Sequence, residues 1–199
     1  MSSPLNDFIM TFVPLFIVID AFGNLPFIVM AAEEMDRRQK TKMVNYAVLT
    51  ATVVGLIFLF IGQWILGVLN IDVQEFAIAG GIVLLVLSIK YMMTGHMITA
   101  VKEELIAVVP IGTPLTVGPA TIATLLLLAG QFPLYMVLVS FIVNMVITWV
   151  IFFLSQRIAR FLGQGGLTAI SRVFALLLAA IAVSMIIGGL KALGIMAGG

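Results

Sequence analysis

The apolar residues of this chain fall into six long stretches. Charged residues lie between most of them, and the uncharged Gly130-Gln131-Phe132-Pro133 forms the expected turn between the fourth and fifth. We also expect a charged loop at residues 33–42 and a loop at Gly163-Gln164-Gly165-Gly166. The stretches cover approximately residues 8–32, 45–70, 73–93, 105–130, 134–155 and 171–190. Each approaches or exceeds the roughly 20 residues that cross a bilayer as a helix. Barrel strands would be shorter and would alternate between apolar and polar residues. A helix also satisfies its own backbone polar groups, as lipid requires. The pattern therefore predicts an all-α membrane protein with six transmembrane helices.

Composition agrees with this prediction. Of the 199 residues, 62% are hydrophobic and only 10% are charged, whereas soluble domains are about half apolar and a quarter charged. The net charge of +1 is too small to suggest nucleic-acid binding. The chain contains no cysteine, so thiolate metal sites, iron–sulfur clusters and cysteine nucleophiles are excluded. The residues before Phe8 include no Lys or Arg, which argues against a cleavable signal peptide.

Basic residues gather on one side of the predicted membrane. That side holds nine of them: Arg37, Arg38, Lys40, Lys42, Lys90, Lys102, Arg157, Arg160 and Arg172. The other side holds Lys191 alone. Cytoplasmic segments of membrane proteins carry the excess of Lys and Arg. We therefore expect both termini outside, and the segments after the first, third and fifth stretches in the cytoplasm.

The first and fourth stretches resemble each other. One contains Val13-Pro14 and then Asp20–Pro26; the other contains Val109-Pro110 and continues to Thr121. The offset between them is about 95 residues, half of the chain. We therefore expect two three-helix repeats, residues 1–95 and 105–199, joined by a cytoplasmic connector at 96–104. With three spans each, the repeats enter the membrane from opposite sides, as in many secondary transporters.

Prolines predict that both of these helices are broken. A proline removes a backbone N–H and clashes with the carbonyl one turn earlier, and it disfavours helical geometry in the preceding residue. The expected breaks lie at Pro14, Pro26, Pro110, Pro114 and Pro119. Matching breaks in two repeats indicate a transport site. Ordinary kinks are the alternative, because Pro and Gly are common in membrane helices.

Asp20 is the strongest single candidate for ion coupling or substrate contact. A carboxylate at the middle of a membrane helix costs roughly 2.5–3.5 kcal/mol on insertion scales. A carboxyl group that gains and loses a proton there suits coupling or substrate contact. The alternative is an Asp that only caps a half-helix by accepting free backbone N–H groups. Asn24 lies one turn later on the same face, and its amide can both donate and accept hydrogen bonds to a substrate.

Further candidates surround the two breaks. They are Gly23 and Pro26 in the first stretch, and Gly112, Thr113, Thr116, Gly118, Pro119 and Thr121 in the fourth. A single threonine in a membrane helix often bonds only its own backbone carbonyls, but as a group we expect at least one hydroxyl to face a cavity. Asn144, in the middle of the fifth stretch, is a second-rank candidate.

Two clusters of small residues predict close helix packing. Ala79-Gly80-Gly81 lies in the third stretch and Gly188-Gly189 in the sixth. Small side chains let membrane helices approach closely. We therefore expect packing, and not a pore, at these positions.

The residues Asp20–Pro26 and Pro110–Ile122 resemble the two signature stretches of the MarC family, which includes the SnatA-type transporters of small neutral amino acids. The resemblance extends over the whole chain in length and span count. Relatives often have Pro after the Asp, where this chain has Ala21. The resemblance implies an inner-membrane (plasma-membrane) protein that moves glycine, alanine or similar amino acids, coupled to H⁺ or Na⁺.

The leading hypothesis is therefore a secondary transporter without a cofactor or metal, and not an enzyme. The alternative is a channel for a small solute or ion with the same architecture, although no selectivity-filter motif is present. An intramembrane aspartyl protease needs two deep carboxylates, and only Asp20 is deep. The single histidine, His96, falls in the connector. The sequence leaves the true substrate, the direction of transport and a homo-oligomer open.

Overall fold

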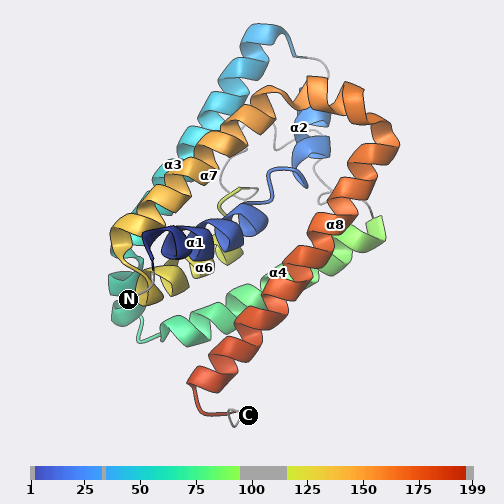
Figure 1. Cartoon of the computed structure of the whole chain (residues 1–199). Coiled ribbons are helices and arrows are strands. Elements are labelled where there is room, and N and C mark those ends of the chain that lie inside the picture. The colour runs from blue at the N-terminus through green and yellow to red at the C-terminus, as the bar shows by residue number, and fades with distance from the viewer. Residues whose placement is uncertain (1–2, 33–34, 95–115, 196–199) are drawn as a thin grey trace.

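The computed structural model of this chain describes residues 3–32, 35–94 and 116–195 (Figure 1). These ranges contain seven α-helices and no strand. The helices are α1 (Pro4–Ile19), α2 (Leu25–Ala31), α3 (Arg37–Val68), α4 (Val73–Thr94), α6 (Pro119–Gln131), α7 (Leu134–Phe153) and α8 (Ser155–Ala192). The predicted all-α class is confirmed. The predicted connector at 96–104 lies outside the described residues, as do Pro110, Gly112, Thr113 and Pro114.

Four helices are long and apolar enough to cross a membrane. They are α3, the part of α4 from Val73 to Lys90, α7, and the part of α8 from Gly165 to Ala192. At about 1.5 Å per residue, the 16 residues of α1 measure about 24 Å, less than the roughly 30 Å of a hydrocarbon core. The first predicted stretch is thus divided between two shorter helices, α1 and α2. In the fourth, the described part contains one short helix, α6.

The helix α3 begins eight residues before its predicted start at residue 45. Asp36 and Gln39 form a capping box: Gln39 N–H donates to Asp36 Oδ1 at 2.7 Å, and Asp36 N–H donates to Gln39 Oε1 at 2.9 Å. These bonds satisfy backbone groups that a helix start leaves free. Arg37, Arg38, Lys40 and Lys42 therefore lie on the first turns of a helix, where a charged loop was expected.

The helix α8 also begins earlier than predicted. The glycine-rich residues 163–166 were expected to form a loop, but the chain leaves helical geometry only at Gly163, with φ 64° and ψ 177°. Glycine adopts this positive φ without steric cost. The result is a kink between Ser155–Leu162 and the long remainder of α8, visible in Figure 1.

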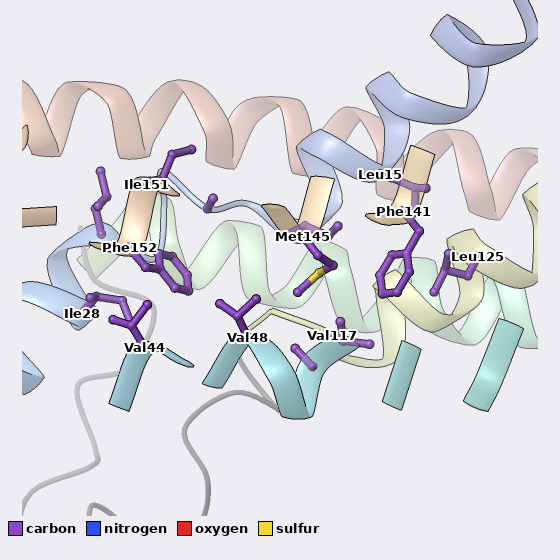
Figure 2. Close-up of a cluster of buried hydrophobic side chains, with 14 of the residues drawn as sticks. Leu15, Ile28, Val44, Val48, Val117, Leu125, Phe141, Met145, Ile151 and Phe152 are labelled. Atoms are coloured by element: carbon purple, nitrogen blue, oxygen red, sulfur yellow. The ribbon is translucent and has the colours of Figure 1, made fainter. Parts of the chain in front are cut away.

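The helices form two buried clusters. The larger joins α1, α2, α3, α6 and α7 and extends from Ile28, Val44 and Phe152 at one end to Phe141 and Leu125 at the other (Figure 2). The smaller includes Leu84, Ala123, Leu178, Ala182 and Met185, from α4, α6 and α8. The outward surfaces of α3, α4, α7 and α8 remain apolar; their exposed side chains include Leu49, Phe60, Trp64, Val86, Val146 and Leu176. Exposed apolar surface of this extent suits contact with lipid.

Close packing of α4 against α8 depends on glycine. A Cβ atom built on Gly81 would lie 2.8 Å from the carbonyl oxygen of Ala182, and one on Gly189 would lie 2.9 Å from that of Gln74. Such distances exclude a side chain unless the backbone moves. The predicted close approach at both glycine clusters is therefore confirmed.

The long helices form two antiparallel pairs in contact, α3 with α7 and α4 with α8. The N-terminus, the α3–α4 turn and the α6–α7 turn lie at the lower left of Figure 1. The start of α3 and the junction of α7 with α8 lie at the upper end. The arginine-rich starts of α3 and α8 are therefore at the end of the molecule opposite to the N-terminus.

Candidate functional site

The backbone is interrupted between α1 and α2. The first helix ends at Ile19, and Asp20 adopts a left-handed conformation with φ 50° and ψ 51°. A positive φ is uncommon for residues other than glycine, although Asp tolerates it better than most. The second helix then begins at Leu25. Five residues, Asp20 to Asn24, therefore form the link.

The two prolines of this region do not mark the interruption. Pro14 lies inside α1, which continues to Ile19, so the break expected there is wrong. One missing N–H removes a single helical hydrogen bond and can be absorbed by a kink. Pro26 is the second residue of α2, in the first turn of a helix, where the N–H would have no intrahelical partner. The interruption therefore falls just before Pro26, at the residues from Asp20 to Asn24.

The Asp20 carboxyl group is buried in the link, with the residue 1% exposed. Its Oδ1 accepts a hydrogen bond from the Gly23 N–H at 2.9 Å. Its Oδ2 is also buried and accepts no hydrogen bond from any residue in the part of the chain that the structure describes. One oxygen therefore holds the link together, while the other is oriented into the interior.

Gly23 gives the carboxyl group its space. A Cβ atom on Gly23 would overlap the Asp20 carboxyl group. Any other residue at this position would displace the carboxyl group or break the hydrogen bond to Oδ1. Of the candidates beside Asp20, Gly23 thus has the clearest steric requirement.

Asn24 is completely buried and completes the link. Its Nδ2 donates to the carbonyl oxygens of Asp20 at 2.9 Å and Ile19 at 3.3 Å. Carbonyls at the end of a helix have no partner within it, so the Asn24 amide satisfies groups that α1 leaves free. The nitrogen expected to recognise a substrate is therefore engaged with the backbone.

The second candidate region precedes α6 and is neutral. Gly118 is the N-cap of α6 with extended geometry, φ −84° and ψ −177°, and Pro119 is the first helical residue, a favoured position for proline. Thr116 and Thr121 are buried. The Thr121 hydroxyl donates to the carbonyl oxygen of Thr116 at 3.1 Å. This threonine therefore bonds the chain just outside its own helix.

The two regions share one core. Val117 packs in the same buried cluster as Ile19, Ala21 and Leu25, which flank or belong to the first link. The helices α1 and α6 are also in contact. The two candidate regions, about 95 residues apart in sequence, therefore border one hydrophobic cluster.

A polar stripe on α7 is the feature that sequence reasoning missed. Ser140, Asn144 and Thr148 are all buried, and their spacing of four residues puts them on one helix face. The Ser140 and Thr11 hydroxyl groups are hydrogen-bonded at 2.6 Å. Of the three, sequence reasoning named only Asn144. The four-residue spacing of polar residues in an otherwise apolar stretch was the signal for the other two.

Asn144 ties this stripe to α1. Its Nδ2 donates to the carbonyl oxygens of Phe12 at 3.2 Å and Ser140 at 2.9 Å. Its Oδ1 is buried and accepts nothing from the residues within 3–32, 35–94 and 116–195. In Figure 1, α1 and α7 both begin at the lower left, near the N-terminus, and run away from it. The stripe therefore meets α1 where Ser140 and Asn144 bond Thr11 and Phe12.

Lys40 is another residue whose burial was not predicted from the sequence. It was expected in a charged loop, yet it is 9% exposed in the first turns of α3. Among the residues that the structure describes, no group of three or more His, Cys, Asp or Glu side chains could hold a metal ion.

Sequence comparisons agree over almost the full chain. The profile described as MarC family integral membrane protein matches residues 5–194. The UPF0056 membrane protein of Buchnera aphidicola subsp. Schizaphis graminum is 32% identical over 193 residues, covering 94% of this chain and 98% of the relative. The UPF0056 inner membrane protein YhgN of Escherichia coli K12 is 30% identical, with the same coverage. A UPF0056 membrane protein of Methanocaldococcus jannaschii is 26% identical, covering 94% of this chain and 97% of its own. No solved structure matches.

Proposed function

Since this chain belongs to the MarC family of integral membrane proteins, we propose that it is a secondary transporter of small neutral amino acids such as glycine and alanine. Coupling to H⁺ or Na⁺ takes place at Asp20. The observation that carries the proposal is the buried Asp20 carboxyl group, whose Oδ2 accepts no hydrogen bond within the described ranges. An ionisable group inside a membrane protein is costly and marks ion or substrate pathways.

The proposed architecture is six spans in two inverted repeats. In it, α1 and α2 form the first span, and residues 105–130, ending in α6, form the fourth. The helix contacts follow a two-fold pattern: α1 contacts α7 as α6 contacts α3, and α2 contacts α8 as α6 contacts α4. Two further pairs, α3 with α7 and α4 with α8, would map onto themselves. This pattern, with the antiparallel course of both pairs, supports the repeat.

The substrate would lie between the link and the start of α6. The first N–H groups of a helix carry partial positive charge, and α6 begins after a glycine, which has no side chain to cap them. These groups suit the carboxylate of an amino acid. Asp20 Oδ2 suits its ammonium group, as a charge-assisted hydrogen bond. The small residues Gly118 and Ala120 favour a small side chain.

The proposed route to this site from outside follows the seam between α1 and α7. Thr11, Ser140, Asn144 and Thr148 line that seam with hydroxyl and amide groups. A polar solute or ion would exchange its hydration for such groups step by step. Asn144 Oδ1 offers an acceptor midway along the seam.

The proposed orientation has both termini outside the cell. The basic starts of α3 and α8 gather at the end opposite to the N-terminus (Figure 1), as the charge rule requires of the cytoplasmic side. The relative YhgN is described as an inner membrane protein, and we extend that location to this chain.

Uptake by proteoliposomes tests the proposal. The wild type should take up labelled glycine and alanine with saturation, and Asp20→Asn should lose most of this uptake. Asp7→Asn is the matched control, because it removes a carboxylate from the first turn of the same helix and should transport normally. Uptake no greater than in protein-free vesicles would contradict the proposal. Unsaturable, voltage-dependent currents in a planar bilayer would instead favour the channel.

A further inference from the structure

A groove opens where α7 meets α8. Its volume is about 480 Å³. Its apolar walls are formed by Phe22, Leu154, Ile158, Phe161, Leu162 and Ile170, and its charged residue is Arg157. The groove lies outside the proposed transport site but includes Phe22, two residues from Asp20.

The kink at Gly163 shapes this groove. It turns Ser155–Leu162 away from the axis of the remaining α8 (Figure 1). The walls from Leu154 to Leu162 therefore come from before the kink, and Ile170 comes from after it. Phe161, beside the kink, is 91% exposed. An aromatic side chain so exposed next to arginines is typical of a segment at the membrane–water interface.

The charge around the groove is positive and lacks a carboxylate from its own helices. Arg157, Arg160 and Arg172 are exposed on α8, and neither α7 nor α8 contains an Asp or Glu. An arginine guanidinium binds phosphate through two parallel hydrogen bonds. Apolar walls beside such a group match a molecule with both a phosphate and a hydrocarbon chain.

We propose that this groove binds an anionic phospholipid from the leaflet beside the basic ends of the helices. The headgroup phosphate binds Arg157, and an acyl chain packs against Phe22, Ile158 and Phe161. Phe22 also contacts the rings of Phe16, at 6.3 Å, and Phe174, at 5.5 Å. A bound lipid would therefore steady the link that holds Asp20. The proposal does not depend on transport.

Native mass spectrometry of the full chain in detergent tests it, with phosphatidylglycerol and phosphatidylcholine of equal chain length. The wild type should bind phosphatidylglycerol about tenfold more tightly. Both lipids carry a phosphate, but the choline cation of phosphatidylcholine offsets the attraction between that phosphate and Arg157, whereas phosphatidylglycerol keeps its net negative charge. Arg157→Gln should lose most of this preference. Arg38→Gln is the matched control, because it removes an exposed arginine at the same end of the molecule, on α3, and should keep the preference. Phe161→Ala should weaken binding of both lipids.

Equal affinity of the wild type for the two lipids would overturn the proposal, as would an unchanged preference in Arg157→Gln. Displacement of the lipid by millimolar glycerol phosphate would show a site for a soluble phosphate compound instead. A dimer in the wild type that Phe161→Ala dissociates would show that a second copy covers the groove. If Arg157→Gln does not fold, Arg157→Lys replaces it, and an intermediate preference is expected because the charge remains without the two-bond geometry.

Discussion

The two candidate regions differ in both backbone and chemistry. The link between α1 and α2 has a left-handed residue, Asp20, and a buried carboxyl group. The approach to α6 has extended geometry at Gly118 and only threonine hydroxyls and backbone groups. Both regions border one hydrophobic cluster. One side of this cluster thus has a buried carboxyl group, and the described residues on the other have hydroxyl and backbone groups alone.

This difference indicates how an amino acid would be oriented. An ammonium group needs an anion or carbonyl oxygens, which the α1–α2 link supplies. A carboxylate needs N–H donors, which the start of α6 supplies. The proposed amino acid site uses this asymmetry, and the following changes test it.

The largest effect on stability is expected from Gly23→Ala. The new methyl group would overlap the Asp20 carboxyl group, and overpacking of this kind costs about 1–3 kcal/mol. Thermal unfolding in detergent measures the loss. The control is Gly67→Ala on α3, where a Cβ meets nothing within 4 Å; it should be neutral or slightly stabilising. Equal stability of the two variants would show that the Asp20 carboxyl group does not pack directly on Gly23.

A somewhat smaller loss is expected from Asn24→Leu. This change removes the side-chain donor from the carbonyl oxygens of Ile19 and Asp20. The Asp20 oxygen keeps the backbone N–H of residue 24 at 3.1 Å, so the loss falls on the Ile19 oxygen, and a buried unsatisfied group costs about 1–3 kcal/mol. Part of that cost is offset by the added apolar contact. Asn45→Leu serves as control, since Asn45 is exposed and accepts one hydrogen bond from Trp149. Thermal unfolding in detergent measures both variants. If Asn24→Leu lowers the unfolding temperature less than Asn45→Leu does, the Asn24 amide does not hold the end of α1 as described.

The smallest loss of stability is expected in the neutral region at the start of α6. Thr121→Val removes the hydrogen bond to the Thr116 carbonyl oxygen, worth about 1 kcal/mol, and should leave ion coupling intact. Thr124→Val should cost less, because its hydroxyl bonds Ala120, whose carbonyl oxygen lies within α6 and accepts a helical bond already. Loss of coupling in Thr121→Val would remove the distinction between the two regions.

The fold class and the approximate positions of the long helices could be predicted, because length and hydropathy depend on local sequence alone. Proline, in contrast, was a poor guide to the interruption. Pro14 is absorbed within α1, and the link lies at Asp20–Asn24, where side-chain hydrogen bonds replace helical ones. The early start of α3 follows from a capping box at Asp36 and Gln39. The charged residues around it were interpreted as a loop, so this helix start was not predicted.

The spacing on α7 could indicate a polar stripe, but the contact of that stripe with α1 could not be predicted from local pattern. Thr11 and Ser140 are 129 residues apart in sequence, and their bond depends on which faces of α1 and α7 meet. Asn144 was found because a lone amide in an apolar stretch is conspicuous. Thr148 and Ser140 were missed because a hydroxyl group in a membrane helix more often bonds its own backbone. Only the packed structure distinguishes the two situations.

Accumulation of labelled alanine in proteoliposomes under an imposed H⁺ or Na⁺ gradient tests the role of Asp20 most directly. The wild type should concentrate alanine above its equilibrium level. Asp20→Asn, which keeps the size of the side chain and its acceptor for the Gly23 N–H, should lose most uptake and should not concentrate alanine under either gradient. Concentration of alanine by Asp20→Asn to the wild-type level would contradict coupling at this residue.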